Sequence, residues 1–175
     1  YIAPDTVKNF EAATGIKVDV VASLGSSGSM RALADGLLDI AVPARPLKSD
    51  ESAAGLRQVE VLRTAYVMAT SHSTPNGLQS ADLAKIFAAE KPTWADGTPI
   101  RIILRPRSDT DTALLGELFS GMGEALEAAR RRAELPTAAT DQDNTAAAER
   151  TPGSLVGTTM TQLKTEPSSL HVRSE

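Results

Sequence analysis

The sequence contains no cysteine among its 175 residues. A disulfide framework, a thiolate zinc site and a cysteine nucleophile are therefore all excluded. Aromatic residues make up only 3% of the chain and are scattered along it, so they offer no platform on which nucleic-acid bases could stack. No apolar run approaches the roughly 18–20 residues that a helix needs to cross a bilayer.

Neither positive nor negative residues are in large excess. The chain has 18 Lys and Arg against 22 Asp and Glu, which gives a formal net charge of −4. This mildly acidic balance argues against nucleic acid as a partner, because nucleic acids are bound by strongly basic surfaces. The length suits one ordinary domain or two small lobes, and the 41% hydrophobic content is that of a globular chain.

Helix and strand patterns alternate along the chain, which predicts an α/β fold with mixed, mostly parallel sheets and flanking helices. Helical spacing of apolar residues predicts helices that begin near residues 5, 30, 49, 80, 111, 123 and 143. Apolar alternation and short apolar runs predict strands at 16–20, 39–42, 59–62, 66–70, 100–104 and 155–156. Asp143 or Asn144 is expected to cap the last of these helices.

A strong turn signal, Ser73-Thr74-Pro75-Asn76-Gly77, follows the strand pattern at 66–70. We interpret it as the crossing between two lobes. Residues 1–72 then form the N-terminal part of a first lobe, and residues 73–160 form a second. The remaining residues, 161–175, are polar and poorly patterned.

Two loops share one pattern, in which a strand is followed by small or hydroxyl-bearing residues and then by the start of a helix. They are residues 25–29 and 105–112. Backbone N–H groups and the helix dipole make such a place attractive to anions. Arg105 could add a planar, bidentate clamp for a tetrahedral oxyanion, and further donors could come from Ser26, Ser27, Ser29, Ser108 and Thr110. The alternative is that these residues are ordinary helix caps and turns.

Three charged residues near these loops need separate interpretation. Arg45, between Pro43 and Pro46, is a further candidate cation, although a structural or solvated arginine is the alternative. Asp109 and Asp111 would repel an anion unless one of them were protonated. We expect at least one of the two to be an N-cap that points away from the ligand.

Catalytic and metal sites find weak support. Gly25-Ser26-Ser27-Gly28-Ser29 is like a nucleophile elbow, but Ser29 stands where that motif needs its last glycine. His72 and His171, the two histidines of the chain, lie in no recognisable pattern with an acidic partner. Residues 141–144 open like a calcium loop but lack its glycine and its bidentate glutamate. We therefore expect no catalytic residue, no metal and no cofactor.

The order of the segments resembles that of the phosphate-binding proteins of ABC transporters, which are type II periplasmic binding proteins. The matching segments are residues 24–33, 36–41, 44–47, 83–87, 94–100, 104–110 and 149–157. The resemblance implies a two-lobe fold with a ligand cleft between the lobes, in which residues 161–175 would start the return to lobe one. It also implies a monomeric solute-binding protein, periplasmic or extracellular and membrane-associated. Such a protein is not an enzyme, and it delivers phosphate or a similar oxyanion to a transporter permease.

Ligand residues are implied by position in the same way. Ser26, Ser27 and Gly28 would act from lobe one, while Ser29 and Arg45 are candidates from the sequence pattern alone. Arg105, Ser108 and Thr110 match the family's Arg and Ser-Gly-Thr segment, and Asp109 stands at the glycine of that segment.

Two departures from the family pattern affect the ligand. Ala44 stands where many members carry an Asp or Ser that touches the ligand and selects a protonated oxyanion, a role that Asp109 could take over. Asp109 itself adds bulk and charge where the backbone should approach the ligand. These departures keep open an alternative, in which the same fold serves as a sensory or partner-binding domain without phosphate transport.

Overall fold

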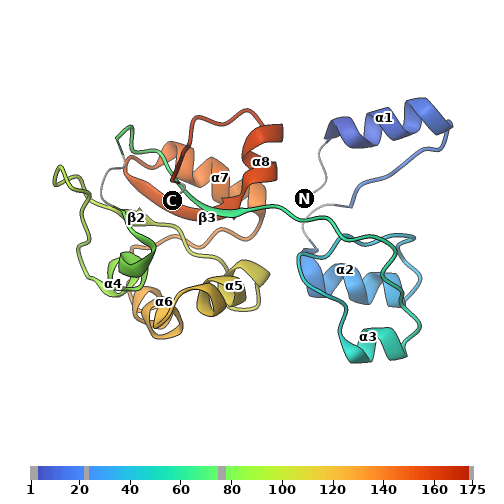
Figure 1. Ribbon diagram of the computed structural model, residues 1–175, viewed down its shortest axis with the longest axis horizontal. Helices are drawn as coiled ribbons and strands as arrows, with labels where there is room; N and C mark the ends of the chain where they lie inside the picture. Colours follow the sequence, from blue (N-terminus) through green and yellow to red (C-terminus); the bar gives the residue numbers. More distant parts are fainter. Residues whose placement is uncertain (1–3, 22–23, 75–77, 174–175) are drawn as a thin grey trace. The chain divides into compact units, whose positions relative to one another are not determined.

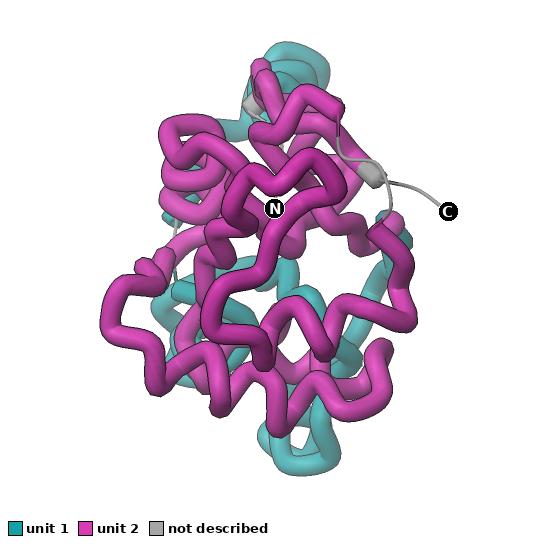
Figure 2. Tube along the Cα trace, turned by 90° about the vertical axis from the view of Figure 1, so that its left-hand side faces the viewer, with its two compact units in different colours: residues 1–64 teal, residues 65–175 magenta. Residues whose placement is uncertain are grey.

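The computed structural model describes residues 4–21, 24–74 and 78–173. The chain divides into unit 1, residues 1–64, and unit 2, residues 65–175 (Figures 1 and 2). The division falls eight residues before the expected boundary at residue 72, because 66–70 forms a central strand of unit 2. Three residues of the predicted turn, 75–77, lie outside the described residues. The assignment of residues to two lobes around a ligand stays a prediction.

The described residues of unit 1 form three helices: α1 (Pro4–Thr14), α2 (Gly25–Ala34) and α3 (Ser49–Ala53). All three confirm predicted helices. α1 ends before Gly15, whose φ of +72° is a conformation that glycine adopts without strain. α2 begins five residues earlier than expected, so the serine-rich segment forms its first turn rather than a loop.

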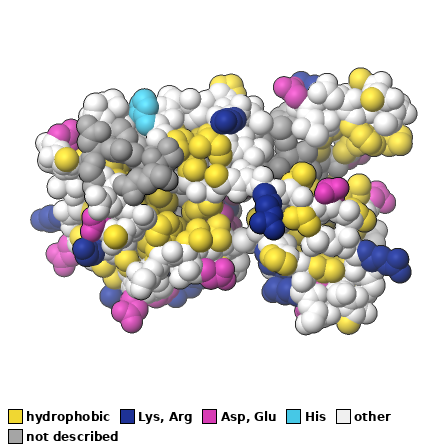
Figure 3. Space-filling model, in the orientation of Figure 1, with side chains coloured by type: hydrophobic (Ala, Val, Ile, Leu, Met, Phe, Trp, Pro, Cys, Tyr) yellow, Lys and Arg dark blue, Asp and Glu magenta, His cyan; other side chains and the backbone are white. Residues whose placement is uncertain are grey.

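The strands predicted in unit 1 at 16–20, 39–42 and 59–62 are wrong, because none of these segments is a strand in the structure. Their apolar side chains are largely exposed, including Ile16, Ile40 and Val59, and Figure 3 shows apolar side chains on the visible face of this unit. A strand needs a neighbour for its backbone N–H and C=O groups. The described residues of unit 1 supply no pairing strand, so the alternating pattern has nothing to pair with.

Unit 2 is built on a four-stranded mixed sheet with the order β2-β3-β1-β4. Its strands are β1 (Tyr66–Thr70), β2 (Arg101–Ile102), β3 (Ser154–Thr159) and β4 (His171–Arg173). β1 runs antiparallel to β3 and to β4, whereas β2 runs parallel to β3. The predictions at 66–70 and 155–156 are confirmed, and the strand predicted at 100–104 is shorter than expected. β4 was not predicted, because its segment is short and polar.

Helices cover both faces of this sheet (Figure 1). They are η1 (Ser80–Asp82), α4 (Leu83–Ala88), α5 (Thr110–Leu118), α6 (Met122–Arg130), α7 (Asp141–Arg150) and α8 (Met160–Thr165). Successive strand residues point to opposite faces. Met68 and Leu155 thus join the cluster under α4, α5 and α6, while Ala69 and Val156 join the cluster with Ala148 of α7. The predicted α/β fold class with a mixed sheet is confirmed, but two of the three strand pairings among the described residues are antiparallel, so the expectation of mostly parallel strands is wrong.

No helix within the described residues is long and apolar enough to cross a membrane. The cap predicted for α7 is wrong. Its N-cap is Thr140, whose Oγ1 accepts a hydrogen bond of 3.0 Å from the backbone N–H of Asp143. Asn144 is instead buried, and its Nδ2 donates to the backbone carbonyl of Gly157 at 2.8 Å.

Candidate functional site

The segment after β2 brings Arg105 to the start of α7. Leu104 pairs with the chain before this helix through two backbone hydrogen bonds, to Pro136 O at 2.9 Å and from Ala138 N at 2.8 Å. Arg105 therefore follows a fixed backbone position between the N-termini of α5 and α7. The dipoles of both helices make this place electropositive.

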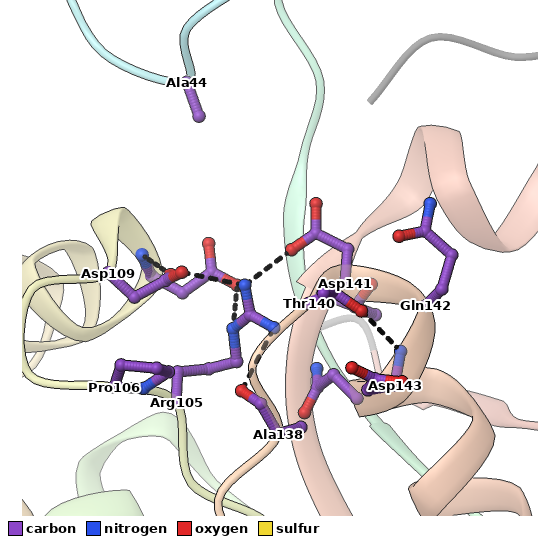
Figure 4. Close-up of polar contacts among 12 residues, drawn as sticks. Ala44, Arg105, Pro106, Asp109, Ala138, Thr140, Asp141, Gln142 and Asp143 are labelled. Atoms are coloured by element: carbon purple, nitrogen blue, oxygen red, sulfur yellow. Dashed lines mark hydrogen bonds and ion pairs between the residues drawn. The ribbon is translucent and has the colours of Figure 1, made fainter. Parts of the chain in front are cut away.

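The guanidinium of Arg105 is buried, with 8% of its side chain exposed. Its Nη2 donates to Asp109 Oδ2 at 2.8 Å and to Asp141 Oδ1 at 2.9 Å, as Figure 4 shows. Its Nη1 donates to Ala138 O at 3.4 Å. Its Nε has no hydrogen-bond partner among the described residues and lies 4.0 Å from Asp111 Oδ2. One cation thus faces three carboxylates.

The carboxylate of Asp109 accepts two hydrogen bonds at once. Asp109 is the N-cap of α5, because its Oδ1 accepts from the backbone N–H of Asp111 at 2.9 Å. Its other oxygen accepts from Arg105. The expected N-cap is thus confirmed, but its carboxylate points toward Arg105 and not away from the candidate site.

Asp111 carries the most perturbed carboxyl group of this cluster. Burial, with a smaller contribution from the negative charges of Asp109 and Asp141, raises its pKa to about 7 against the opposing effect of Arg105. Asp111 is then partly protonated at neutral pH. A proton here relieves the crowding of negative charge, in the way that the sequence analysis required for an anion to approach.

Tyr66 of β1 lies beside the same cluster and was not predicted as a site residue. Its hydroxyl is buried without a hydrogen-bond partner among the described residues. Burial and the charge of Asp111 raise the pKa of this hydroxyl far above its ordinary value, so it stays neutral. A Cβ atom at Gly157 of the neighbouring β3 would overlap the Tyr66 hydroxyl, so only glycine fits there.

A second arginine holds the loop that carries Arg105. Arg130, near the C-terminus of α6, donates from Nη2 to Arg105 O at 2.9 Å, and Thr112 Oγ1 donates to Pro106 O at 2.9 Å. Arg130 was not predicted as a site residue, because nothing in the sequence distinguishes it from the two arginines that follow it. Of the other predicted residues here, Ser108 is exposed and Thr110 is the first residue of α5.

The predicted site residues of unit 1 cluster at the N-terminus of α2. Ser26 Oγ accepts from Ala44 N at 3.0 Å, and Ser29 Oγ donates to Ser26 O at 3.0 Å. Ser27 is exposed, and Gly28 lies within the first turn of the helix. Neither bond caps the helix, whose N-cap residue is Leu24 and has no side-chain cap hydrogen bond, and the contact of these residues with a ligand stays a prediction.

Arg45 forms a closed ion pair. Its Nη1 and Nη2 donate to the two carboxylate oxygens of Glu51, at 2.9 and 2.6 Å. Arg45 also donates to Pro46 O, and the Glu51 carboxylate accepts from Lys48 N. These bonds lower the pKa of Glu51 to about 2, the bond to Arg45 having the largest effect. A guanidinium that is fully engaged in this way fits the structural alternative, and ligand binding by Arg45 stays a prediction.

His72 has an acidic partner after all, which corrects the sequence analysis. Its Nε2 lies 3.0 Å from Asp96 Oδ2, and its Nδ1 accepts from Thr74 N at 3.1 Å. Because both ring nitrogens are engaged, His72 is poorly placed to act as a general base. Among the described residues, no group of three or more His, Cys, Asp or Glu is arranged to hold a metal ion.

Three solved structures share this fold at low sequence identity. A candidate phosphate ABC transporter substrate-binding protein from Clostridium perfringens, solved with bound phosphate, is 15% identical with a TM-score of 0.73. PstS from Borrelia burgdorferi is 20% identical with a TM-score of 0.53. A candidate phosphate-binding protein from Planctomyces limnophilus is 16% identical with a TM-score of 0.50.

The matched lengths are unequal. The alignments cover 96%, 97% and 95% of this chain but 68%, 70% and 62% of the three proteins, in the same order. No curated protein matches the chain significantly. The family model described as the PBP superfamily domain matches residues 2–171, which is nearly the whole chain. The resemblance inferred from the sequence is thereby confirmed, and this chain belongs to the family that this model describes, the PBP superfamily domain.

Proposed function

We propose that this chain is a solute-binding protein that binds a tetrahedral oxyanion, phosphate first among them, for delivery to the permease of an ABC transporter. The observation that carries the proposal is Arg105, a buried guanidinium between two helix N-termini whose Nε lacks a hydrogen-bond partner among the described residues. Unsatisfied buried donors are costly, and an oxyanion oxygen is the acceptor that they favour.

The family and its relatives support the ligand. Two of the similar structures are candidate phosphate-binding proteins, one of them solved with phosphate. We further propose an extracytoplasmic location, a monomeric state and the absence of catalysis, which are expectations from membership of this family. The engagement of both nitrogens of His72 supports the last of these.

Isothermal titration with phosphate, and then with sulfate at the same ionic strength, tests the proposal. Wild-type protein is expected to bind phosphate. Arg105→Lys keeps the charge but loses the planar pair of donors, and it should weaken binding by at least about 100-fold, the equivalent of one or two charge-assisted hydrogen bonds. Arg107→Ala is the matched control, because Arg107 lies two residues away, is mostly exposed and pairs with Glu127.

The outcomes separate the parts of the proposal. Binding that survives in Arg105→Lys would place the oxyanion elsewhere. Absence of binding to any oxyanion by the wild type would overturn the function and favour the alternative, a sensory or partner-binding domain of the same fold. One observation favours that alternative: the Nη2 of Arg105 is already shared between two carboxylates.

A further inference from the structure

We propose that the carboxylate of Asp141 occupies, in the protein without ligand, a place on Arg105 that a bound oxyanion must take. Asp141 then acts as an internal competitor that lowers the affinity of the site for oxyanions. The inference rests on the proposed function, since it concerns the same arginine. It assigns a role to a residue that the sequence analysis connected only with an incomplete calcium-loop pattern.

The fixed geometry of the Arg105 guanidinium limits where an oxyanion can bind. An arginine presents its N–H groups along fixed edges, and a tetrahedral oxyanion gains most when two parallel N–H groups reach it. Both bonds of Nη2 end on carboxylates, one on Asp109 and one on Asp141. Nη1 donates to Ala138 O, and the unbonded Nε faces Asp111 at 4.0 Å. An oxyanion that is to gain a pair of bonds through Nη2 must therefore displace a carboxylate.

The two carboxylates bonded to Nη2 of Arg105, those of Asp109 and Asp141, differ in how easily they can leave it. Asp109 is 17% exposed and is tied by its second oxygen to the N-terminus of α5, so its departure would also uncap that helix. Asp141 is 45% exposed, and its carboxylate has no further hydrogen-bond partner among the described residues. The N-terminus of α7 is capped independently by Thr140. Asp141 can thus rotate toward solvent at little cost to the helix.

The charges around Arg105 also oppose the binding of an oxyanion. With Asp109 and Asp141 ionised, Arg105 and its neighbours carry a formal charge of −1, and of −2 whenever Asp111 is ionised too, so an arriving oxyanion meets repulsion as well as competition. Removing the charge of Asp141 relieves both effects, whereas removing a nearby charge that does not touch Arg105 relieves little. This difference is what separates competition for donors from a general effect of charge.

Asp141→Asn and Asp143→Asn form a matched pair for the test. Both residues lie in the first turn of α7, and both substitutions remove one negative charge. The side chain of Asp143 is exposed and does not contact Arg105. Phosphate is titrated calorimetrically into the wild type and each variant at one ionic strength, and thermal unfolding confirms that each variant is folded. Asp141→Ser is a second variant in case the asparagine itself bonds to Arg105.

We expect phosphate to bind Asp141→Asn at least about 10-fold more tightly than the wild type, equivalent to about 1.4 kcal/mol. Asp143→Asn should stay within about twofold of the wild type. Measurable but weak phosphate binding by the wild type, with much tighter binding by both Asp141→Asn and Asp141→Ser, would support the inference most strongly.

Other results count against it. Wild-type binding with no gain in either Asp141 variant overturns this inference and leaves the proposed function standing. An equal gain in Asp143→Asn shows that general charge, and not competition on Arg105, sets the affinity. No binding by any of the four proteins overturns the proposed function and this inference together.

Discussion

The two units differ in what they do with their apolar residues and with their arginines. Unit 2 buries alternating strand residues on both faces of a sheet, and Leu155 and Val156 are each fully buried. Unit 1 leaves most of its large apolar side chains exposed, and Met30 is the buried apolar residue among those described there. The lesson is that a periodic apolar pattern creates a core only where a neighbouring strand or helix is present to receive it.

The arginines repeat this contrast. Arg45 of unit 1 has one carboxylate, which engages both ends of its guanidinium. Arg105 of unit 2 has three carboxylates, of which two share one nitrogen. A one-to-one pair leaves little for a ligand to gain, whereas a crowded arginine has partners that a ligand can replace. We therefore place the exchangeable site at Arg105.

The contrast in cores predicts the largest difference in stability. Leu155→Ala should lower the free energy of unfolding by about 2–5 kcal/mol, because it leaves a cavity in a fully buried position. Leu62→Ala, at a residue that is 86% exposed, should change it by less than about 0.5 kcal/mol. Urea unfolding followed by circular dichroism measures both. A comparable loss in Leu62→Ala would show that the apolar surface of unit 1 is covered in solution.

The ionisation of Asp111 predicts the next largest effect. Its pKa is raised from 3.8 to about 7 in the folded protein, so between these values the folded state holds a proton that the unfolded state has released. Stability should therefore fall as pH rises from about 4 to 7, by roughly 2–4 kcal/mol, and level off above 7. Burial of the carboxyl group is the main cause of this window, followed by the charges of Asp109 and Asp141, while Arg105 acts in the opposite direction.

Asp111→Asn isolates this effect, because the asparagine side chain keeps the shape of aspartate but cannot ionise. The difference in unfolding free energy between the wild type and Asp111→Asn should change with pH across that window and become constant above it. Parallel pH profiles would mean that Asp111 is ionised throughout and that the crowding at Arg105 is relieved in some other way.

How much of this was predictable from the sequence differs between the units for the same physical reason. In unit 2 the runs at 66–70 and 155–156 predicted strands correctly, because adjacent segments exist to pair with them. The pairing itself, and β4, depend on contacts between distant residues that no local pattern records. In unit 1 the equally regular alternation at 16–20 predicted a strand that the structure does not contain.

The candidate site shows the same limit. Arg105 was predicted from its place before a hydroxyl-rich helix start, and Asp109 was expected as a cap. Asp141 comes from a segment 36 residues away along the chain and reaches Arg105 because Leu104 pairs with the backbone before α7. Tyr66 reaches the cluster only through the register of β1 against β3. Sequence reasoning found the residues that act locally and missed those that the sheet brings together.

The close packing of Gly157 in β3 against Tyr66 in β1 predicts a smaller effect on stability. Gly157→Ala should lower stability by about 1–3 kcal/mol, because the new methyl group overlaps the Tyr66 hydroxyl. Gly116→Ala in α5 is the control: a Cβ there meets no atom within 4 Å, and alanine favours the helix, so stability should rise by up to about 1 kcal/mol. Tyr66→Phe should restore part of the loss in the Gly157→Ala background. Failure to do so would place the clash elsewhere than at the hydroxyl.

The ion pair between Arg45 and Glu51 predicts the smallest effect on stability. Its dependence on pH is opposite in sign to that of Asp111. The pKa of Glu51 is lowered from 4.5 to about 2 in the folded protein, so the stability it contributes is present above pH 4.5 and is lost as pH falls toward 2. Glu51→Gln should remove this acid-sensitive component while leaving the window between pH 4 and 7 unchanged. Unfolding of each variant from pH 2 to pH 5, compared with Asp111→Asn over the same range, measures it. A Glu51→Gln protein as acid-sensitive as the wild type would show that Arg45 is not held by Glu51 in solution, and Arg45 would then become a second candidate for the oxyanion.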